Sequence, residues 1–250
     1  MTDLSAFSLE GRTVMVTGAN TGIGQGIAVS AAKAGAKVLG VGRSDLSETA
    51  RLIGDAFVPL SCDLADLDAA RAMLEMAWRE HGTIDGLVNN AGIIRRADAL
   101  DFSEEDWDAV IDTNLKSVFF LCQAAGRHMV GQGRGKIINI ASMLSFQGGI
   151  RVPSYTASKS GVAGLTKLLA NEWAAKGINV NAIAPGYIAT NNTAALQADE
   201  TRNRQITERI PAGRWGAPSD LGGAAIFLAS AASDYVSGHV LAVDGGWLGR

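Results

Sequence analysis

Short runs of apolar residues, most of them ending at glycine or at a small polar residue, recur along the whole chain. Strands of a parallel sheet are covered on both faces, so they read as continuous apolar segments rather than as alternating ones. The pattern predicts seven buried strands, at residues 12–17, 37–41, 57–60, 84–88, 136–141, 178–183 and 240–243.

The segments between these runs carry the small or periodically spaced apolar residues that are typical of helices. They predict a helix after the first strand and others at about 67–81, from Ser103, at 107–129, from Tyr155 onward, at 190–209 and at 219–231. Alternating strands and helices indicate an α/β fold: a single-domain, doubly wound parallel sheet over residues 1–250, with helices on both faces. Such sheets bind ligands at the carboxyl ends of their strands, so functional side chains are expected there.

The composition narrows the class of protein. With 250 residues, 47% of them hydrophobic, the chain can bury the core of one such domain. Its net charge of −3 gives no electrostatic reason to expect nucleic acid or an anionic membrane as a partner. Cys62 and Cys122 lie far apart, so neither a disulfide framework nor a metal site is expected. The start lacks a signal-peptide pattern and no apolar stretch could span a bilayer, which predicts a cytoplasmic protein.

A glycine-rich turn, G-A-N-T-G-I-G at 18–24, joins the first predicted strand to the first helix. Gly18 permits a tight turn, Gly22 lets the backbone approach a pyrophosphate, and Gly24 allows close packing of helix on strand. The helix N-terminus offers free N–H groups to the anion. The spacing is G-x-x-x-G-x-G rather than the more familiar G-x-G-x-x-G, and the turn predicts a phosphate-binding loop.

The second and third strands end at Arg43 and Asp63, where a dinucleotide fold meets the adenosine. No acid follows the second strand to bind both ribose hydroxyls. Arg43 is free to pair with a 2′-phosphate, to stack on adenine, or to lie in solvent. Asp63 either accepts from the adenine amino group or caps the next helix.

Amides follow the fourth strand, at Asn89 and Asn90. We interpret Asn89 as a structural link between neighbouring strands, and both residues lie where a cofactor cleft would be lined. Asn114 lies inside the long predicted helix, and from its position alone we interpret it as a core residue whose polar groups are hydrogen-bonded within the protein.

Tyr155 and Lys159 are spaced i, i+4, which places phenol and ammonium on one face of a helix. A positive charge beside a phenol stabilises the phenolate and lowers its pKa, which suits the phenol to proton transfer with a carbonyl or alcohol oxygen. Ser142 stands at the carboxyl end of the fifth strand, thirteen residues earlier.

Taken together, T-G-A-N-T-G-I-G (17–24), N-N-A-G (89–92), Ser142, Y-T-A-S-K (155–159) and P-G-Y-I-A-T (185–190) resemble the short-chain dehydrogenase/reductase family. Order and spacing agree over essentially the whole chain. The resemblance implies a Rossmann-like fold, a nicotinamide cofactor and a homotetramer.

The resemblance also implies catalytic roles. Tyr155 would be the acid/base, and Lys159 would lower its pKa and hold the nicotinamide ribose. Ser142 would polarise the substrate oxygen. Asn114 would hold a water of the proton relay, which replaces its reading as a core residue.

Thr190 and the backbone of Ile188 would bind the nicotinamide carboxamide. The remaining cofactor contacts that the resemblance and the residues imply are Gly18, Asn20, Thr21, Gly22, Ile23, Gly24, Arg43, Asp63, Leu64, Asn90, Ala91, Gly92, Tyr155, Lys159, Pro185 and Gly186. The resemblance favours NAD(H), whereas the lack of an acid beside Arg43 leaves NADP(H) open.

Longer strings, such as R-I-P-A-G-R-W-G, resemble family members that interconvert 2-keto-3-deoxy-D-gluconate and 2,5-diketo-3-deoxy-D-gluconate in hexuronate breakdown. This small sugar acid is a carboxylate, and guanidinium groups suit carboxylates. Arg95, Arg96 and Arg151 are therefore candidate substrate residues, with Gln147 and Asn191 as partners for hydroxyls.

Two alternatives stay open. One is a reductase of another carbonyl, such as a 3-ketoacyl thioester or a different uronate-derived keto acid. The other is a protein that senses nicotinamide without turnover, which predicts degenerate catalytic positions, although all four are present here.

Overall fold

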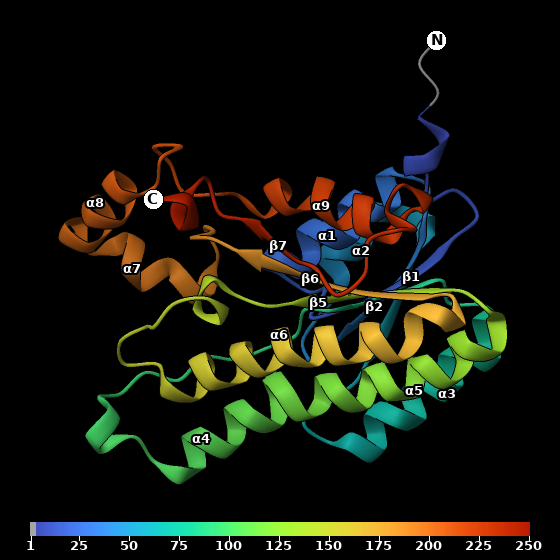
Figure 1. Cartoon of the computed structure of the whole chain (residues 1–250), viewed down its shortest axis with the longest axis horizontal. Coiled ribbons are helices and arrows are strands. Elements are labelled where there is room, and N and C mark those ends of the chain that lie inside the picture. The colour runs from blue at the N-terminus through green and yellow to red at the C-terminus, as the bar shows by residue number, and fades with distance from the viewer. Residues whose placement is uncertain (1–3) are drawn as a thin grey trace.

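One seven-stranded sheet runs through the protein, shown here as a computed structural model that describes residues 4–250. All the strands are parallel and their order is β3-β2-β1-β4-β5-β6-β7 (Figure 1). The order reverses between β1 and β4, and doubly wound sheets bind their ligands at such a reversal. The strands are β1 (Thr13–Thr17), β2 (Lys37–Gly42), β3 (Phe57–Ser61), β4 (Gly86–Asn89), β5 (Gly135–Ile140), β6 (Ile178–Pro185) and β7 (Val240–Val243).

Helices cover both faces of the sheet and bury two apolar cores against it (Figure 1). One face is covered by α1 (Gly22–Lys33), α2 (Ser47–Ile53) and α9 (Gly222–Ala229). The other is covered by α3 (Leu67–His81), α5 (Ser117–Gln132) and α6 (Pro153–Trp173). The remaining helices are α4 (Glu104–Ile111), α7 (Ala194–Ala198) and α8 (Glu200–Arg209).

The sequence pattern predicted this architecture well. All seven strands are confirmed, and the helix predicted at 67–81 is α3 with the same bounds. Helix α2 was not predicted, because a helix of only seven residues carries little periodic signal. The long continuous helix predicted at 107–129 is wrong in one respect. It is divided into α4 and α5 by a π-helical turn, Asp112–Lys116, and turns of this kind often lie at functional sites.

The glycine turn between β1 and α1 has the predicted geometry. Gly18 and Gly22 have φ angles of 65° and 58°, in the left-handed region that side chains disfavour. A Cβ on Gly24 would overlap the carbonyl group of Gly18. The helix therefore starts directly against the end of the strand, and its first residues, Gly22 and Ile23, line the cleft described below.

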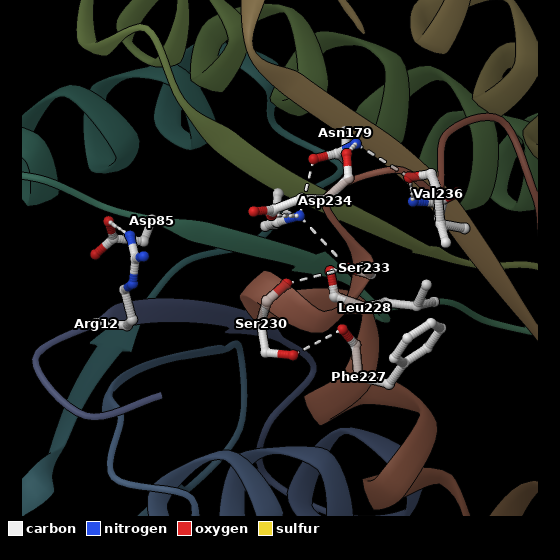
Figure 2. Close-up of polar contacts among 11 residues, drawn as sticks. Arg12, Asp85, Asn179, Phe227, Leu228, Ser230, Ser233, Asp234 and Val236 are labelled. Carbon is white, nitrogen blue, oxygen red and sulfur yellow. Dashed lines mark hydrogen bonds and ion pairs between the residues drawn. The ribbon is translucent and has the colours of Figure 1, made fainter. Parts of the chain in front are cut away.

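Polar contacts hold the sheet together at its opposite, amino-terminal edge (Figure 2). The buried carboxylate of Asp85 accepts hydrogen bonds from Arg12 at 3.0 Å and from Arg134 at 3.2 Å. Asn179 donates to the carbonyl of Asp234 at 3.0 Å, which ties β6 to the turn after α9 (Figure 2). These charges pair with one another around a cavity of about 330 Å³ at this edge.

Candidate active site

A cleft of about 520 Å³ lies at the carboxyl ends of the strands, and we refer to it as the main cleft. It runs from the glycine turn to the first turns of α6. Fourteen of the predicted cofactor residues line it: Gly18, Asn20, Thr21, Gly22, Ile23, Arg43, Asp63, Leu64, Asn90, Ala91, Gly92, Tyr155, Lys159 and Thr190. Gly24, Pro185, Gly186 and Ile188 do not line it; Gly186 and Ile188 line a neighbouring cavity at the end of β6.

Amides fix the strand ends beneath this cleft. Asn90 donates to the carbonyl of Thr17 at 2.9 Å, and its own backbone N–H donates to the Thr17 hydroxyl at 2.9 Å. Asn89 donates to the side chain of Asn139 at 2.9 Å in the buried sheet. The structural interpretation of Asn89 is therefore confirmed, and Asn90 holds β4 against the glycine turn.

Arg43 and Asp63 face each other across the cleft end nearest β2 and β3. Their ion pair is 3.4 Å long and both side chains are largely exposed. The cap of α3 is Asp66, which accepts from the N–H groups of Asp68 and Ala69. Asp63 is therefore not the helix cap, and its carboxylate remains at the cleft.

Tyr155 and Lys159 lie at the start of α6, where Pro153 occupies the first turn, in which its missing N–H costs no hydrogen bond. Lys159 is only 5% exposed, and its Nζ donates to the carbonyl of Ile140 at 2.6 Å. The same nitrogen is 5.6 Å from the centroid of the Tyr155 ring. The predicted pairing of phenol and ammonium on one face is therefore present.

The pKa of Tyr155 departs from the prediction. Burial raises it above the ordinary value of 10.0, while the hydrogen bond with Ser142 and the charge of Arg96 act to lower it. Burial also lowers the pKa of Lys159 to about 8. We predicted a lowered pKa for the phenol because the sequence shows the neighbouring charge but not the loss of solvent, which is the larger effect here.

Ser142 and Asn114 stand behind the lining of the main cleft. Ser142 hydrogen-bonds Tyr155, and its hydroxyl accepts from the N–H of Leu144 at 3.1 Å. Asn114 lies in the π-helical turn with no exposed surface. Its amide accepts from the N–H of Ile93 and donates to the carbonyl of Ile93, both at 2.8 Å. The side chain thus holds the loop after Gly92; a water-holding role in the relay stays a prediction.

The three candidate arginines differ in their contacts. Arg95 lines the main cleft but pairs with Asp106 at 3.0 Å. Arg151 pairs with Asp98 at 3.3 Å and has a φ angle of 63°. Arg96 has no carboxylate partner in the described part of the chain, and it donates to the carbonyl of Asn192 at 3.1 Å.

Arg96 is also the arginine whose charge acts on Tyr155. Arg96 does not itself line the main cleft, but of the three arginines its guanidinium is the one without a carboxylate partner in residues 4–250, which leaves it available to an acid.

The structure also shows functional candidates that the sequence did not. Asn192 lines the cleft and receives the hydrogen bond of Arg96. Trp247, near the C-terminus, donates to Gln147 at 3.2 Å, whereas Gln147 does not itself line the main cleft. These are contacts across long sequence distances, and no local pattern signals them. Asn191, a candidate from the sequence, lines the cleft.

Over residues 4–250, no group of three or more His, Cys, Asp and Glu side chains is arranged to hold a metal ion. No helix in that range combines the length and the apolar character needed to cross a membrane.

The fold and this cleft define an oxidoreductase of the Rossmann type, and comparison with known proteins agrees. Residues 18–248 match the family described as enoyl-(acyl carrier protein) reductase, adh_short_C2. The chain belongs to the short-chain dehydrogenase/reductase family and is an oxidoreductase that uses a nicotinamide cofactor.

Particular relatives are very similar over their full lengths. The 2-dehydro-3-deoxy-D-gluconate 5-dehydrogenase of Escherichia coli K12 is 62% identical over 251 residues, covering 99% of both chains. The Bacillus subtilis enzyme of the same name is 59% identical, covering 98% of both.

Solved structures agree as well. An Agrobacterium tumefaciens protein, provisionally named a 2-deoxy-D-gluconate 3-dehydrogenase and carrying bound NADP, is 61% identical with a TM-score of 0.93, covering 98% of this chain and 99% of that one. A gluconate 5-dehydrogenase from Burkholderia cenocepacia, in complex with NADP and tartrate, is 42% identical with a TM-score of 0.94, covering 99% of both.

Proposed function

We propose that this protein interconverts 2-keto-3-deoxy-D-gluconate and 2,5-diketo-3-deoxy-D-gluconate. The observation that carries the proposal is Arg96, whose guanidinium has no carboxylate partner in residues 4–250 and donates to the carbonyl of Asn192, a residue that lines the main cleft. A sugar acid bound there would present its carboxylate to an arginine and its reacting oxygen to a phenol. The 62% identical relative named for this activity supports the same substrate class.

Each residue of the site has a separate role in the proposed reaction. The nicotinamide, when bound, supplies or accepts the hydride. Tyr155 gives a proton to the substrate oxygen during reduction and takes it back during oxidation, and Ser142 donates a hydrogen bond to that oxygen. Lys159, charged below its pKa of about 8, stabilises the phenolate that the proton transfer leaves. Asn114 keeps the loop after Gly92 in place beside these groups.

The glycine turn and the cleft fit a dinucleotide, and we infer that the preferred one is NADP(H). Arg43 is the cation at the adenosine end, and its only ion pair in the described residues is the exposed one with Asp63. A 2′-phosphate would meet that guanidinium. Similar proteins hold bound NADP in their crystal structures. This reverses the leaning towards NAD(H) that we took from the family resemblance.

We also propose that the protein is a cytoplasmic homotetramer built from one functional domain. The family resemblance supports this assembly, and size-exclusion chromatography with light scattering would measure it.

The direct test is the rate of nicotinamide oxidation by the purified protein with 2,5-diketo-3-deoxygluconate, in parallel with NADPH and NADH. We expect fast turnover, with kcat/KM for NADPH at least about 10-fold higher, since a charged hydrogen bond to a phosphate contributes about 1.5–3 kcal/mol. A preference for NADH would overturn the assignment to Arg43. Turnover of a 3-ketoacyl thioester in place of the sugar acid would establish the alternative function.

Arg96→Ala should raise KM for the sugar acid by about 10- to 100-fold, because one charge-assisted hydrogen bond is lost. The effect on a neutral ketone analogue should be much smaller. Arg151→Ala is the matched control, since that guanidinium already pairs with Asp98, and we expect it to change KM little. The measurement is steady-state kinetics of both variants on both substrates. Equal effects of Arg96→Ala on acid and neutral ketone would show that Arg96 does not bind the carboxylate.

A further inference from the structure

Trp247 lies three residues from the end of the chain, yet it is only 4% exposed. The C-terminus lies beside α7 and α8, at the carboxyl edge of the sheet (Figure 1). The indole N–H of Trp247 donates to the side-chain carbonyl of Gln147 at 3.2 Å. Gln147 itself lies outside the lining of the main cleft, on the segment that leads from Ser142 to Tyr155.

The direction of this indole is strongly constrained. The Trp247 ring packs against Tyr187, with centroids 4.8 Å apart, and against the guanidinium of Arg209 at 3.9 Å. Met143, the residue after Ser142, belongs to the same buried cluster. The carboxylate of Asp244 accepts from the N–H groups on both sides of Trp247, each at 2.8 Å. The indole N–H therefore points in one direction only.

A fixed indole N–H determines how the Gln147 amide is turned. An indole nitrogen can donate but never accept, so the amide must present its oxygen to Trp247. The NH₂ group is then the end left for a partner. In residues 4–250 no hydrogen bond occupies it.

We propose that Trp247 is a positioning residue that keeps the NH₂ group of Gln147 available to an oxygen of the sugar acid. The ligand group is an acceptor, a carboxylate or a hydroxyl oxygen. This inference rests on the proposed function, and it assigns to the C-terminal segment a part in substrate selection.

Trp247→Phe tests it by removing the N–H while keeping an aromatic ring. The amide of Gln147 is then free to turn its oxygen towards the substrate. We expect KM for the sugar acid to rise about twofold, because only one of the two amide orientations then presents the NH₂ group, with KM for NADPH unchanged. Trp215→Phe is the matched control: its indole N–H lies in the same aromatic cluster but donates to Asn203 at 2.8 Å, away from Gln147. It should leave KM for the acid unchanged, since it does not touch Gln147.

Substitutions at Gln147 extend the test. Gln147→Glu keeps an acceptor for Trp247 but has no donor, so we expect at least the same rise in KM. Gln147→Met lacks both groups, and adding Trp247→Phe to it should have no further effect on KM. Additive effects of Gln147→Met and Trp247→Phe would overturn the proposal. So would equal effects of Trp247→Phe and Trp215→Phe.

The failure of this proposal can be told from the failure of the proposed function. If the parent protein turns over the sugar acid and Trp247→Phe leaves its KM unchanged, only the role of Trp247 is refuted. If the parent turns over no sugar acid, the proposed function falls and this inference falls with it. Should Trp247→Phe be poorly folded by circular dichroism, Gln147→Glu and Gln147→Met decide the matter, and a KM equal to the parent's in both refutes the role.

Discussion

Tyr155→Phe should reduce turnover by about 10²- to 10⁴-fold, the contribution that general acid–base catalysis commonly makes. The substitution removes one oxygen and leaves the ring, so the first turn of α6 and the cleft wall keep their shape. The dissociation constant for NADPH should change by less than about threefold, because the ring and Lys159 remain beside the cofactor. Steady-state kinetics and a fluorescence titration with NADPH measure the two quantities separately.

The raised pKa of Tyr155 predicts how the oxidation rate depends on pH. Because burial moves its pKa above 10.0, the phenol is protonated throughout the neutral range and is ready to donate during reduction. Oxidation needs the phenolate, so the oxidation rate of the parent should increase as the pH rises. Tyr235→Phe is the control, since that ring is fully exposed, and it should change neither rate. Comparable turnover by Tyr155→Phe and the parent would remove Tyr155 from the catalytic role.

Much of the fold could be predicted because its signals are local. A buried parallel strand is a short apolar run, and the glycine turn must have glycine at Gly18, where φ is 65°. The topology rules of parallel sheets then bring the ends of these strands to one edge. This explains why residues as distant as Gly22 and Tyr155 were correctly expected to line one cleft.

What the sequence could not give depends on contacts between distant segments. The π-helical turn around Asn114 has the composition of an ordinary helix, and only the structure shows its altered backbone and the paired hydrogen bonds of Asn114 with Ile93. The three arginines look equivalent in sequence. Only the structure shows that Arg95 and Arg151 already have carboxylate partners.

Burial is the other quantity that a sequence hides. The spacing of Tyr155 and Lys159 placed a charge beside a phenol, and the structure has both groups there. The net pKa shifts nevertheless follow loss of solvent, which raises the pKa of the phenol and lowers that of the ammonium. Each shift favours the uncharged form of its group.

Lys159→Met should lower turnover by about 10²-fold or more, because the phenolate loses its neighbouring cation in a site with little solvent. The same substitution should stabilise the fold. The pKa of Lys159 falls from 10.5 to about 8 in the folded protein, which corresponds to about 3 kcal/mol against the charged form. Methionine carries no such cost, although the hydrogen bond to Ile140 is lost and offsets part of the gain.

The gain in stability expected for Lys159→Met depends on pH. A lysine with a lowered pKa destabilises the folded protein fully below pH 8, and the cost disappears as the pH rises from about 8 to 10.5. The advantage of Lys159→Met should therefore be largest below pH 8 and vanish above pH 10.5. Urea denaturation without cofactor, at pH 7 and in steps above pH 8, measures it.

Lys136→Met is the matched control for Lys159→Met. That lysine is also largely buried but has a carboxylate partner, Asp234, at 2.7 Å. It lies at the amino-terminal edge of the sheet, so its loss should destabilise the protein and leave kcat unchanged. If both variants lose stability equally, the buried ammonium of Lys159 does not destabilise the folded protein, and this prediction is wrong.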